Sequence, residues 1–255
     1  MFKFAVAVAL ACALFSGAAV AQPAKPTVVL VHGAFADSSS WNGVVEILRK
    51  DGFPVVAAAN PLRSVANDAA YVSDVVGSIA GPVVLVGHSY GGQVISTAAN
   101  GHDNIKSLVY VAAFAPDAGE SVADLAGKFP GGTLSGALAA PVKLSGGGVD
   151  LYIDQAKFHD QFASDVPSEQ AALMAAGQRP VTEAALIDKS GAPAWKKLPS
   201  WFVYGTGDKN IPAAALGFMA ERAGSKRTVV VDGASHVVMV SHPDKVAELI
   251  EEAAK

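Results

Sequence analysis

The chain has 255 residues, of which 51% are hydrophobic and 16% charged, so it is long enough to bury one sizeable core. Its 19 Lys and Arg against 23 Asp and Glu give a formal net charge of −4. No cluster of basic residues favours nucleic acid or anionic lipid as a partner, which argues against those classes of binding protein.

The first 21 residues have the three parts of a secretory signal: a basic start, an apolar stretch and a cleavage site of small residues. Lys3 precedes the apolar stretch 4–15, and an A-x-A pattern ends at Ala21. We therefore expect a signal peptide over 1–21 and a mature chain that begins at Gln22. Loss of Lys3 changes the net charge from −4 to −5.

A membrane anchor is the alternative interpretation of this segment, but its apolar stretch is short for a bilayer and ends in a processing signal. The single cysteine, Cys12, lies inside it, so the mature chain has no thiol and no disulfide. A lipoprotein box at 9–12 is disfavoured because it comes too early in the apolar region. We expect a periplasmic or secreted protein with no membrane partner after cleavage.

Strand and helix patterns alternate along the first half of the mature chain. The continuous β-branched run at 27–31 is typical of a strand that is buried on both faces. Strict alternation builds a parallel sheet with helices on both faces. Strands are expected at 27–31, 53–58, 83–86, 105–112, 201–204 and 228–231, and helices at 41–48, 64–79, 93–99 and 243–254.

The alternation breaks over about 117–198, where glycine-rich stretches occur and no strong strand pattern is present. Short helices are expected at 168–176 and 182–187. A segment that is too long for a loop and too weakly patterned for the sheet indicates an insertion. We therefore predict one α/β domain over 22–255 with an inserted, mostly helical lid at about 117–198.

The sequence Gly-His-Ser-Tyr-Gly-Gly at 87–92 directly follows the expected strand at 83–86 and precedes an expected helix. This order predicts a sharp turn with Ser89 at its apex, which Gly87 and Gly91 permit because they have no Cβ to clash. The turn would expose the Ser89 hydroxyl beside a helix N-terminus, whose free N–H groups stabilise negative charge. A chance match in a chain with 25 glycines is the alternative.

A serine nucleophile needs a positioned base, and that base needs an acid that fixes its tautomer. His236 lies in a short loop after the last expected strand, where a base could reach back over Ser89. His88 is adjacent to the serine, but neighbouring side chains on a sharp turn point apart. We therefore predict His236 as the base, with a structural histidine as the alternative. Other histidines, less suitably placed, are His32, His102 and His242.

The acid should follow another strand at the same edge of the sheet. Asp208, in Gly-Thr-Gly-Asp at 205–208, comes just after the expected strand at 201–204, although it could instead cap a helix. Asp117 is the second candidate, and Asp232 comes too early in the histidine loop. Ser89, Asp208 and His236 then follow the chain order that hydrolases use.

The intermediate of acyl transfer carries an oxyanion that needs two N–H donors. The Tyr90 backbone directly follows the nucleophile and should supply one. The Ala34 backbone, after His-Gly at 32–33, should supply the other.

Together these motifs resemble the α/β-hydrolase superfamily over nearly all of the mature chain. Within it, His-Gly-Ala-Phe at 32–35 with Trp41 nearby, Phe-Ala-Pro-Asp at 114–117 and His-Val-Val-Met at 236–239 are similar to small bacterial esterases and to the plant methylesterase and hydroxynitrile lyase group. The resemblance implies the α/β-hydrolase fold, with a mainly parallel sheet of about six strands, and a lidded serine esterase without a cofactor.

The chain departs from the lyases at two positions. Val237 stands where they have a lysine, and Gly33 stands where they have a threonine. Both departures weaken a cyanohydrin-cleaving activity. Epoxide hydrolases and haloalkane dehalogenases need a carboxylate nucleophile, and this chain has Ser89 there.

Several side chains are candidates for the wall of a substrate pocket. Phe35 and Tyr90 qualify because their backbones already face the site, and His159 could donate to a substrate. Ordinary packing in the lid is the alternative for each lid residue. We name Phe35, Phe158, His159 and Trp195 as the substrate-binding candidates. Further lid residues considered are Phe162, Leu173 and Met174.

We therefore expect a serine hydrolase that cleaves small to medium carboxylic esters through an acyl-enzyme. A small-molecule ester is the expected partner, with no metal, no nucleic acid and a monomeric or homodimeric chain. A lyase, acyl transferase or perhydrolase on the same scaffold remains an alternative. A ligand-binding receptor with a vestigial triad is another.

Overall fold

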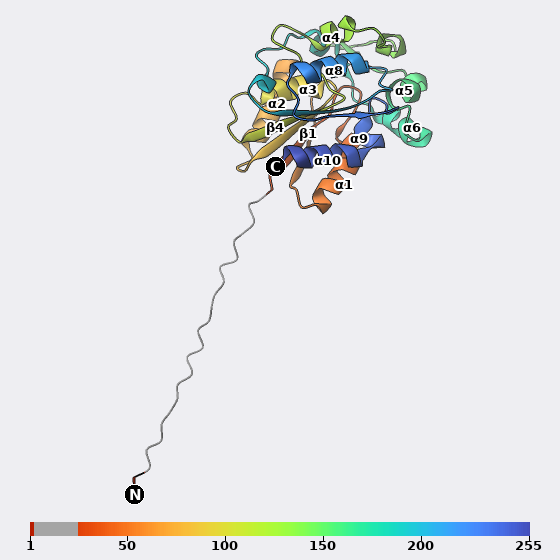
Figure 1. Cartoon of the computed structure of the whole chain (residues 1–255). Helices are drawn as coiled ribbons and strands as arrows, with labels where there is room; N and C mark the ends of the chain where they lie inside the picture. Colours follow the sequence, from red (N-terminus) through yellow and green to blue (C-terminus); the bar gives the residue numbers. More distant parts are fainter. Residues whose placement is uncertain (3–24) are drawn as a thin grey trace.

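The apolar runs of the sequence form one parallel sheet. In the computed structural model, which describes residues 1–2 and 25–255, six strands pair in the order β2-β1-β3-β4-β8-β9 (Figure 1). Every neighbouring pair is parallel, which confirms the predicted sheet. The strands span Thr27–Val31 (β1), Val55–Ala58 (β2), Val83–His88 (β3), Ile105–Val111 (β4), Ser200–Gly205 (β8) and Thr228–Val231 (β9).

Helices cover both faces of this sheet, so the central strands are buried on both sides. Figure 1 shows α1, α9 and α10 on one face and α2, α3 and α8 on the other. Helix α2 begins where the Ser64 hydroxyl accepts a hydrogen bond from the Asn67 N–H. The helices span Asn42–Lys50 (α1), Val65–Gly77 (α2), Gly91–Ala98 (α3), Ala213–Arg222 (α8), Val238–Ser241 (α9) and Pro243–Ala253 (α10), and a 3₁₀ turn at Ser38–Trp41 (η1) precedes α1.

An inserted segment of short helices and strands lies between β4 and β8, and its expected role as a lid stays a prediction. The expected helices at 168–176 and 182–187 are present as α6 and α7. The segment also holds a small antiparallel sheet in the order β5-β6-β7, whose strands are too short to give an alternating pattern in the sequence. Its elements are Val122–Lys128 (α4), Leu134–Ala137 (η2), Val142–Lys143 (β5), Val149–Leu151 (β6), Gln155–Phe162 (α5), Ser168–Gly177 (α6), Val181–Thr182 (β7), Glu183–Ile187 (α7) and Ala194–Lys196 (η3).

A buried aromatic contact fixes α3 against the sheet. The Tyr110 ring on β4 stacks on Phe202 of β8 with centroids 4.5 Å apart. The Tyr110 and Ser96 hydroxyls form a hydrogen bond of 2.7 Å. Because Ser96 lies on α3, this contact holds the helix whose N-terminus lies beside Ser89.

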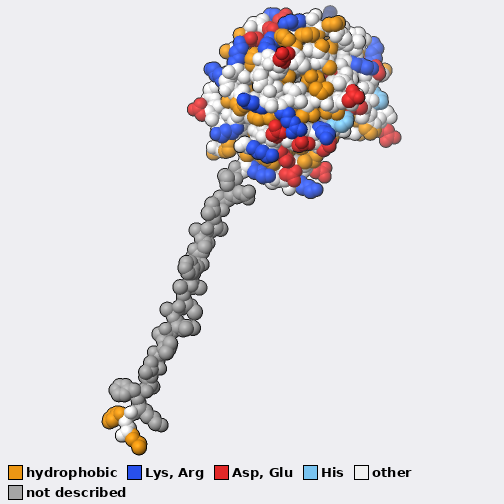
Figure 2. Space-filling model, in the orientation of Figure 1, with side chains coloured by type: hydrophobic (Ala, Val, Ile, Leu, Met, Phe, Trp, Pro, Cys, Tyr) orange, Lys and Arg blue, Asp and Glu red, His pale blue; other side chains and the backbone are white. Residues whose placement is uncertain are grey.

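The predicted signal peptide, apart from residues 1 and 2, lies outside the described residues, and so does Cys12. Of the residues that are described, none belongs to a helix that is both long enough and apolar enough to cross a bilayer. On the face seen in Figure 2, acidic and basic side chains lie intermixed.

Candidate active site

Ser89 occupies a strained turn between β3 and α3. Its φ is 53°, in the left-handed region that most residues avoid. A Cβ on Gly87 would lie 2.6 Å from the Gly91 carbonyl oxygen, and one on Gly91 would lie 2.6 Å from the Val31 carbonyl oxygen. Only glycine fits at either position, for the reason that the sequence suggested. The Ser89 residue is 7% exposed and lines a cavity.

The structure brings Asp208 and His236 into contact. His236 Nδ1 lies 2.7 Å from Asp208 Oδ2, and both side chains are buried. Because a carboxylate oxygen only accepts, Nδ1 carries the proton and Nε2 keeps its lone pair. Asp208 Oδ1 accepts from the N–H groups of Asn210 at 2.8 Å and Ile211 at 2.9 Å. These bonds fix the carboxylate, so the imidazole has one tautomer and one orientation.

The loops that carry this pair pack backbone against backbone. A Cβ on Gly205, at the end of β8, would lie 2.0 Å from the Ala234 carbonyl oxygen. The Thr206 hydroxyl donates to Asp232 at 2.9 Å and accepts from the Gly233 N–H at 2.7 Å. Asp232 therefore joins the two loops, and Asp208 is the carboxylate that touches His236.

The cavity has a volume of about 440 Å³ and lies between the sheet edge and the inserted segment. Ser89 and His236 both line it, together with the predicted pocket residue Phe35. Helix α4 contributes one face of small side chains, and Leu186 of α7 adds a larger one. The α4 residues are Val122, Ala123, Ala126 and Gly127. A mainly apolar wall around a serine hydroxyl suits an uncharged organic group.

Ala34 and Tyr90, the predicted oxyanion residues, also line the cavity. Within residues 25–255, neither N–H group forms a hydrogen bond, whereas the Phe35 N–H donates to the Arg179 carbonyl at 3.0 Å. The Tyr90 side chain is buried and donates from its hydroxyl to Asp68 at 2.8 Å. Burial and this carboxylate raise the pKa of Tyr90 far above its usual range, so its hydroxyl stays protonated.

Three predicted pocket residues lie outside the cavity lining. Phe158 is fully buried and packs on Phe162, with ring centroids 4.9 Å apart. His159 is exposed on α5, and its Nε2 donates to the Val166 carbonyl at 2.9 Å. Neither side chain lines the cavity, because one turn of α5 carries both inward and outward side chains, and Phe162 is the residue of this helix that reaches the cavity.

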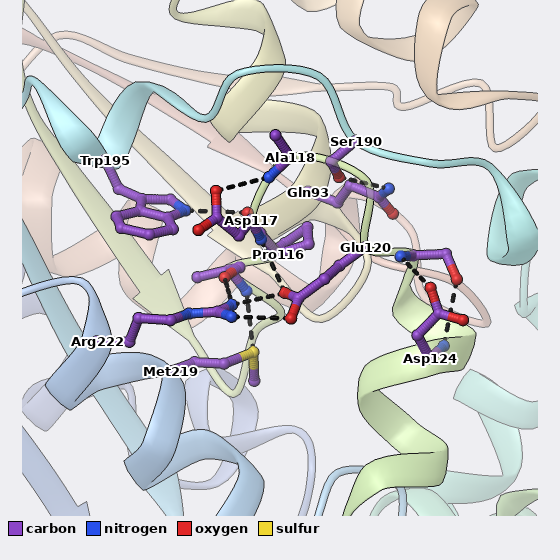
Figure 3. A network of polar contacts seen from close by, with 12 residues as sticks. Gln93, Pro116, Asp117, Ala118, Glu120, Asp124, Ser190, Trp195, Met219 and Arg222 are labelled. Carbon is purple, nitrogen blue, oxygen red and sulfur yellow. Dashed lines mark hydrogen bonds and ion pairs between the residues drawn. The ribbon is translucent and has the colours of Figure 1, made fainter.

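Trp195, the third of these, belongs to the polar network that Figure 3 shows. Its Nε1 donates to the Pro116 carbonyl at 3.1 Å. Asp117, the second candidate for the acid, forms an ion pair with Lys196 at 2.5 Å, whereas the carboxylate that contacts His236 is that of Asp208. That ion pair lowers the pKa of Asp117.

Arg222 and Glu120 form the centre of the same network (Figure 3). The guanidinium of Arg222 donates to Glu120 Oε1 at 2.9 Å and lies 2.8 Å from Oε2. It also donates to the Ala115 carbonyl at 2.8 Å. This pair lowers the pKa of Glu120 and holds the chain just after β4, where Phe114 lines the cavity.

Sequence reasoning missed the α4 wall, although its signal is present. Residues 122, 123, 126 and 127 recur at helical spacing on one face. The role of Asn210 and Ile211 in holding Asp208 also escaped notice, because backbone donors leave no mark in a sequence. In the part of the chain that the structure describes, no group of three His, Cys, Asp or Glu side chains is arranged to hold a metal.

Known proteins resemble this chain over most of its length. A model described as the alpha/beta hydrolase family matches residues 28–249. A pimeloyl-[acyl-carrier protein] methyl ester esterase of Aeromonas hydrophila is 27% identical over 242 residues and aligns with 89% of this chain and 94% of its own length.

Solved structures share the fold. Polyneuridine aldehyde esterase superposes with a TM-score of 0.79 at 19% identity and covers 91% of this chain and 100% of its own. An extracellular alpha/beta-hydrolase from a Paenibacillus species, described as sharing homology with tobacco salicylic acid binding protein 2, has a TM-score of 0.73 at 26% identity, with coverage of 90% and 99%. Together, these likenesses support an esterase that acts on a small molecule.

Proposed function

This chain belongs to the alpha/beta hydrolase family, and we propose that it is a secreted serine hydrolase that cleaves small to medium carboxylic esters through an acyl-enzyme. The observation that carries the proposal is the buried contact between His236 and Asp208, which leaves the Nε2 lone pair available beside the cavity that Ser89 lines.

In the proposed mechanism, Ser89 Oγ attacks the ester carbonyl while His236 Nε2 takes the hydroxyl proton. The Ala34 and Tyr90 N–H groups stabilise the oxyanion, and each such donor lowers the barrier by about 3–4 kcal/mol. His236 then gives its proton to the leaving alkoxide, which breaks the ester bond and leaves Ser89 acylated. A water molecule, deprotonated by His236, releases the acid and restores the serine.

Asp208 keeps its place throughout this cycle. Its Oδ2 holds Nδ1–H of His236, and the carboxylate stabilises the imidazolium that forms during each proton transfer. The unpaired N–H groups of Ala34 and Tyr90 are available to an oxyanion because residues 25–255 provide no other acceptor for them.

Burst kinetics test the mechanism. Purified protein mixed with a chromogenic ester should release about one equivalent of alcohol rapidly and then turn over more slowly, which is the signature of an acyl-enzyme whose hydrolysis is slower than its formation. Ser89→Ala should lose both phases, and an organophosphonate should label wild type at Ser89 only. Unchanged turnover in Ser89→Ala would refute the serine mechanism.

Secretion is proposed from the pattern at residues 1–21, and the extracellular relative is in keeping with it. Expression of the full chain in a bacterium should give a periplasmic or exported product whose N-terminal residue is Gln22. A product that keeps Lys3 and stays in the cytoplasm would contradict this part of the proposal.

A further inference from the structure

His88 packs against His236, the proposed base. The residue is 0% exposed, and its ring centroid is 4.8 Å from that of His236. Its Nε2 lies 3.1 Å from the His236 carbonyl oxygen. A carbonyl can only accept, so the Nε2 of His88 carries the proton and donates.

The surroundings of His88 keep the ring neutral. Trp41 and Phe162 meet it edge to face, with centroids 6.4 and 6.3 Å away. Burial and the nearby His236 hold the pKa of His88 well below its usual value. A charged ring here would repel the imidazolium that His236 forms during the reaction, whereas the neutral ring does not.

The other ring nitrogen argues against a purely packing role. Within the described residues, Nδ1 of His88 is buried and has no hydrogen-bond partner. An apolar side chain would fill this site without leaving a buried polar atom unpaired, which is costly. The benefit of a histidine at this position therefore lies in the single bond that Nε2 makes.

That bond joins the two halves of the proposed proton-transfer pair. His88 directly precedes Ser89 on the turn, while its partner carbonyl is 148 positions away along the chain. Asp208 holds the ring of His236, and His88 holds its backbone. Ser89 and His236 are thus fixed relative to each other by a side chain that lies outside the cavity lining.

We propose that His88 is a positioning residue, whose Nε2–H sets the distance between the Ser89 turn and the His236 loop. The inference rests on the proposed serine mechanism. It predicts that the donor matters for the chemical step and has little influence on substrate binding, because His88 is absent from the cavity lining.

A matched pair of variants isolates the donor. His88→Gln and His88→Met have side chains of nearly equal length, but only glutamine has an N–H group to offer the carbonyl. We expect His88→Gln to keep kcat within about 3-fold of wild type. We expect His88→Met to lose about 10- to 100-fold in kcat with an unchanged KM, because a misplacement of about 1 Å costs up to about 100-fold.

Phosphonate titration of Ser89 supplies the concentration of folded sites for each variant, so that kcat refers to competent enzyme. Equal kcat values in the Gln and Met variants, or a KM that rises while kcat holds, would overturn the positioning role. If His88→Met does not fold, His88→Asn replaces it, because its shorter amide cannot reach the carbonyl and should lose kcat in the same way.

Ser89→Ala, assayed alongside, distinguishes a failure of the positioning role of His88 from a failure of the serine mechanism. Lost turnover in Ser89→Ala together with equal His88 variants removes the positioning role and leaves the serine mechanism intact. Full turnover in Ser89→Ala removes both.

Discussion

Gly33 lies where the loop after β1 passes the Ser89 turn, and a methyl group has no room there. A Cβ on Gly33 would lie 2.6 Å from the Ser89 Cβ and 2.7 Å from the His88 carbonyl oxygen, against ordinary contacts of 3.4–4 Å. In Gly33→Ala, the loop and the turn must therefore separate by about 0.8 Å, the difference between 2.6 and 3.4 Å. The Ser89 turn has little room to yield, because Gly91 of the same turn is itself in close contact with β1.

In the proposed mechanism, this displacement moves the Ala34 N–H away from the oxyanion that it stabilises. We expect kcat to fall about 100-fold in Gly33→Ala, because a shift of about 1 Å in a reacting group has that effect. Overpacking should also lower the free energy of unfolding by about 1–3 kcal/mol. Initial rates on a chromogenic ester, normalised by phosphonate titration, and urea unfolding measure the two effects separately.

Gly146→Ala is the matched control, since a Cβ on Gly146 would meet nothing within 4 Å. It should change kcat less than about 2-fold and stability by less than about 0.5 kcal/mol. Wild-type kcat and stability in Gly33→Ala would show that the tight contact between this loop and the Ser89 turn has no effect on either. The same contact bears on the lyase alternative, since a threonine at this position would not fit the backbone seen here.

Substitutions at three other positions test the stability of the fold and the size of the cavity. Burial lowers the pKa of His32 from its ordinary value of 6.5 to about 4. As the pH falls below 6.5, this histidine therefore binds a proton in the unfolded chain before it does so in the folded one, and the folded state loses stability. The free energy of unfolding is therefore lower by about 3 kcal/mol at pH 4 than at neutral pH. In urea unfolding, His32→Asn should show a smaller difference in the free energy of unfolding between pH 5 and 8 than the wild type does. Glu120→Gln breaks the partly buried pair with Arg222 and should lower the melting temperature through a loss of about 1–2 kcal/mol; an unchanged melting temperature would mean that the pair contributes nothing. Ala126→Phe narrows the cavity and should lower kcat/KM for bulky esters at least about 10-fold while sparing acetyl esters, so equal losses on both would place Ala126 outside the substrate path.

The sheet and the contact between Asp208 and His236 could be predicted from the sequence because each has a local cause. A strand that is covered on both faces must be apolar at successive positions, as β3 is. Parallel strands also bring their carboxyl ends to one edge. Asp208 follows β8 and His236 follows β9, so their contact at 2.7 Å follows from the order of the strands.

The cavity wall could not be predicted in the same way, because helix periodicity alone does not say which partner a face meets. Phe158 and Phe162 lie four residues apart on α5 and both are buried, yet only Phe162 lines the cavity. For Trp195, the decisive contact is the Pro116 carbonyl, which lies far away in the chain. Both outcomes depend on how the inserted segment docks.

The packing of the inserted segment also connects the cavity wall to the loop that carries Asp208. Gln161 of α5 donates to Asn210 Oδ1 at 2.8 Å and to the Lys209 carbonyl at 3.0 Å. The Asn210 N–H in turn holds Asp208. Gln161 therefore anchors the loop whose Asp208 contacts His236. The residue after Gln161, Phe162, lines the cavity. Under the proposed mechanism, a substitution on this helix that reshapes the cavity should therefore also disturb the Asp208 loop, because Gln161 joins the two through its bonds to Lys209 and Asn210.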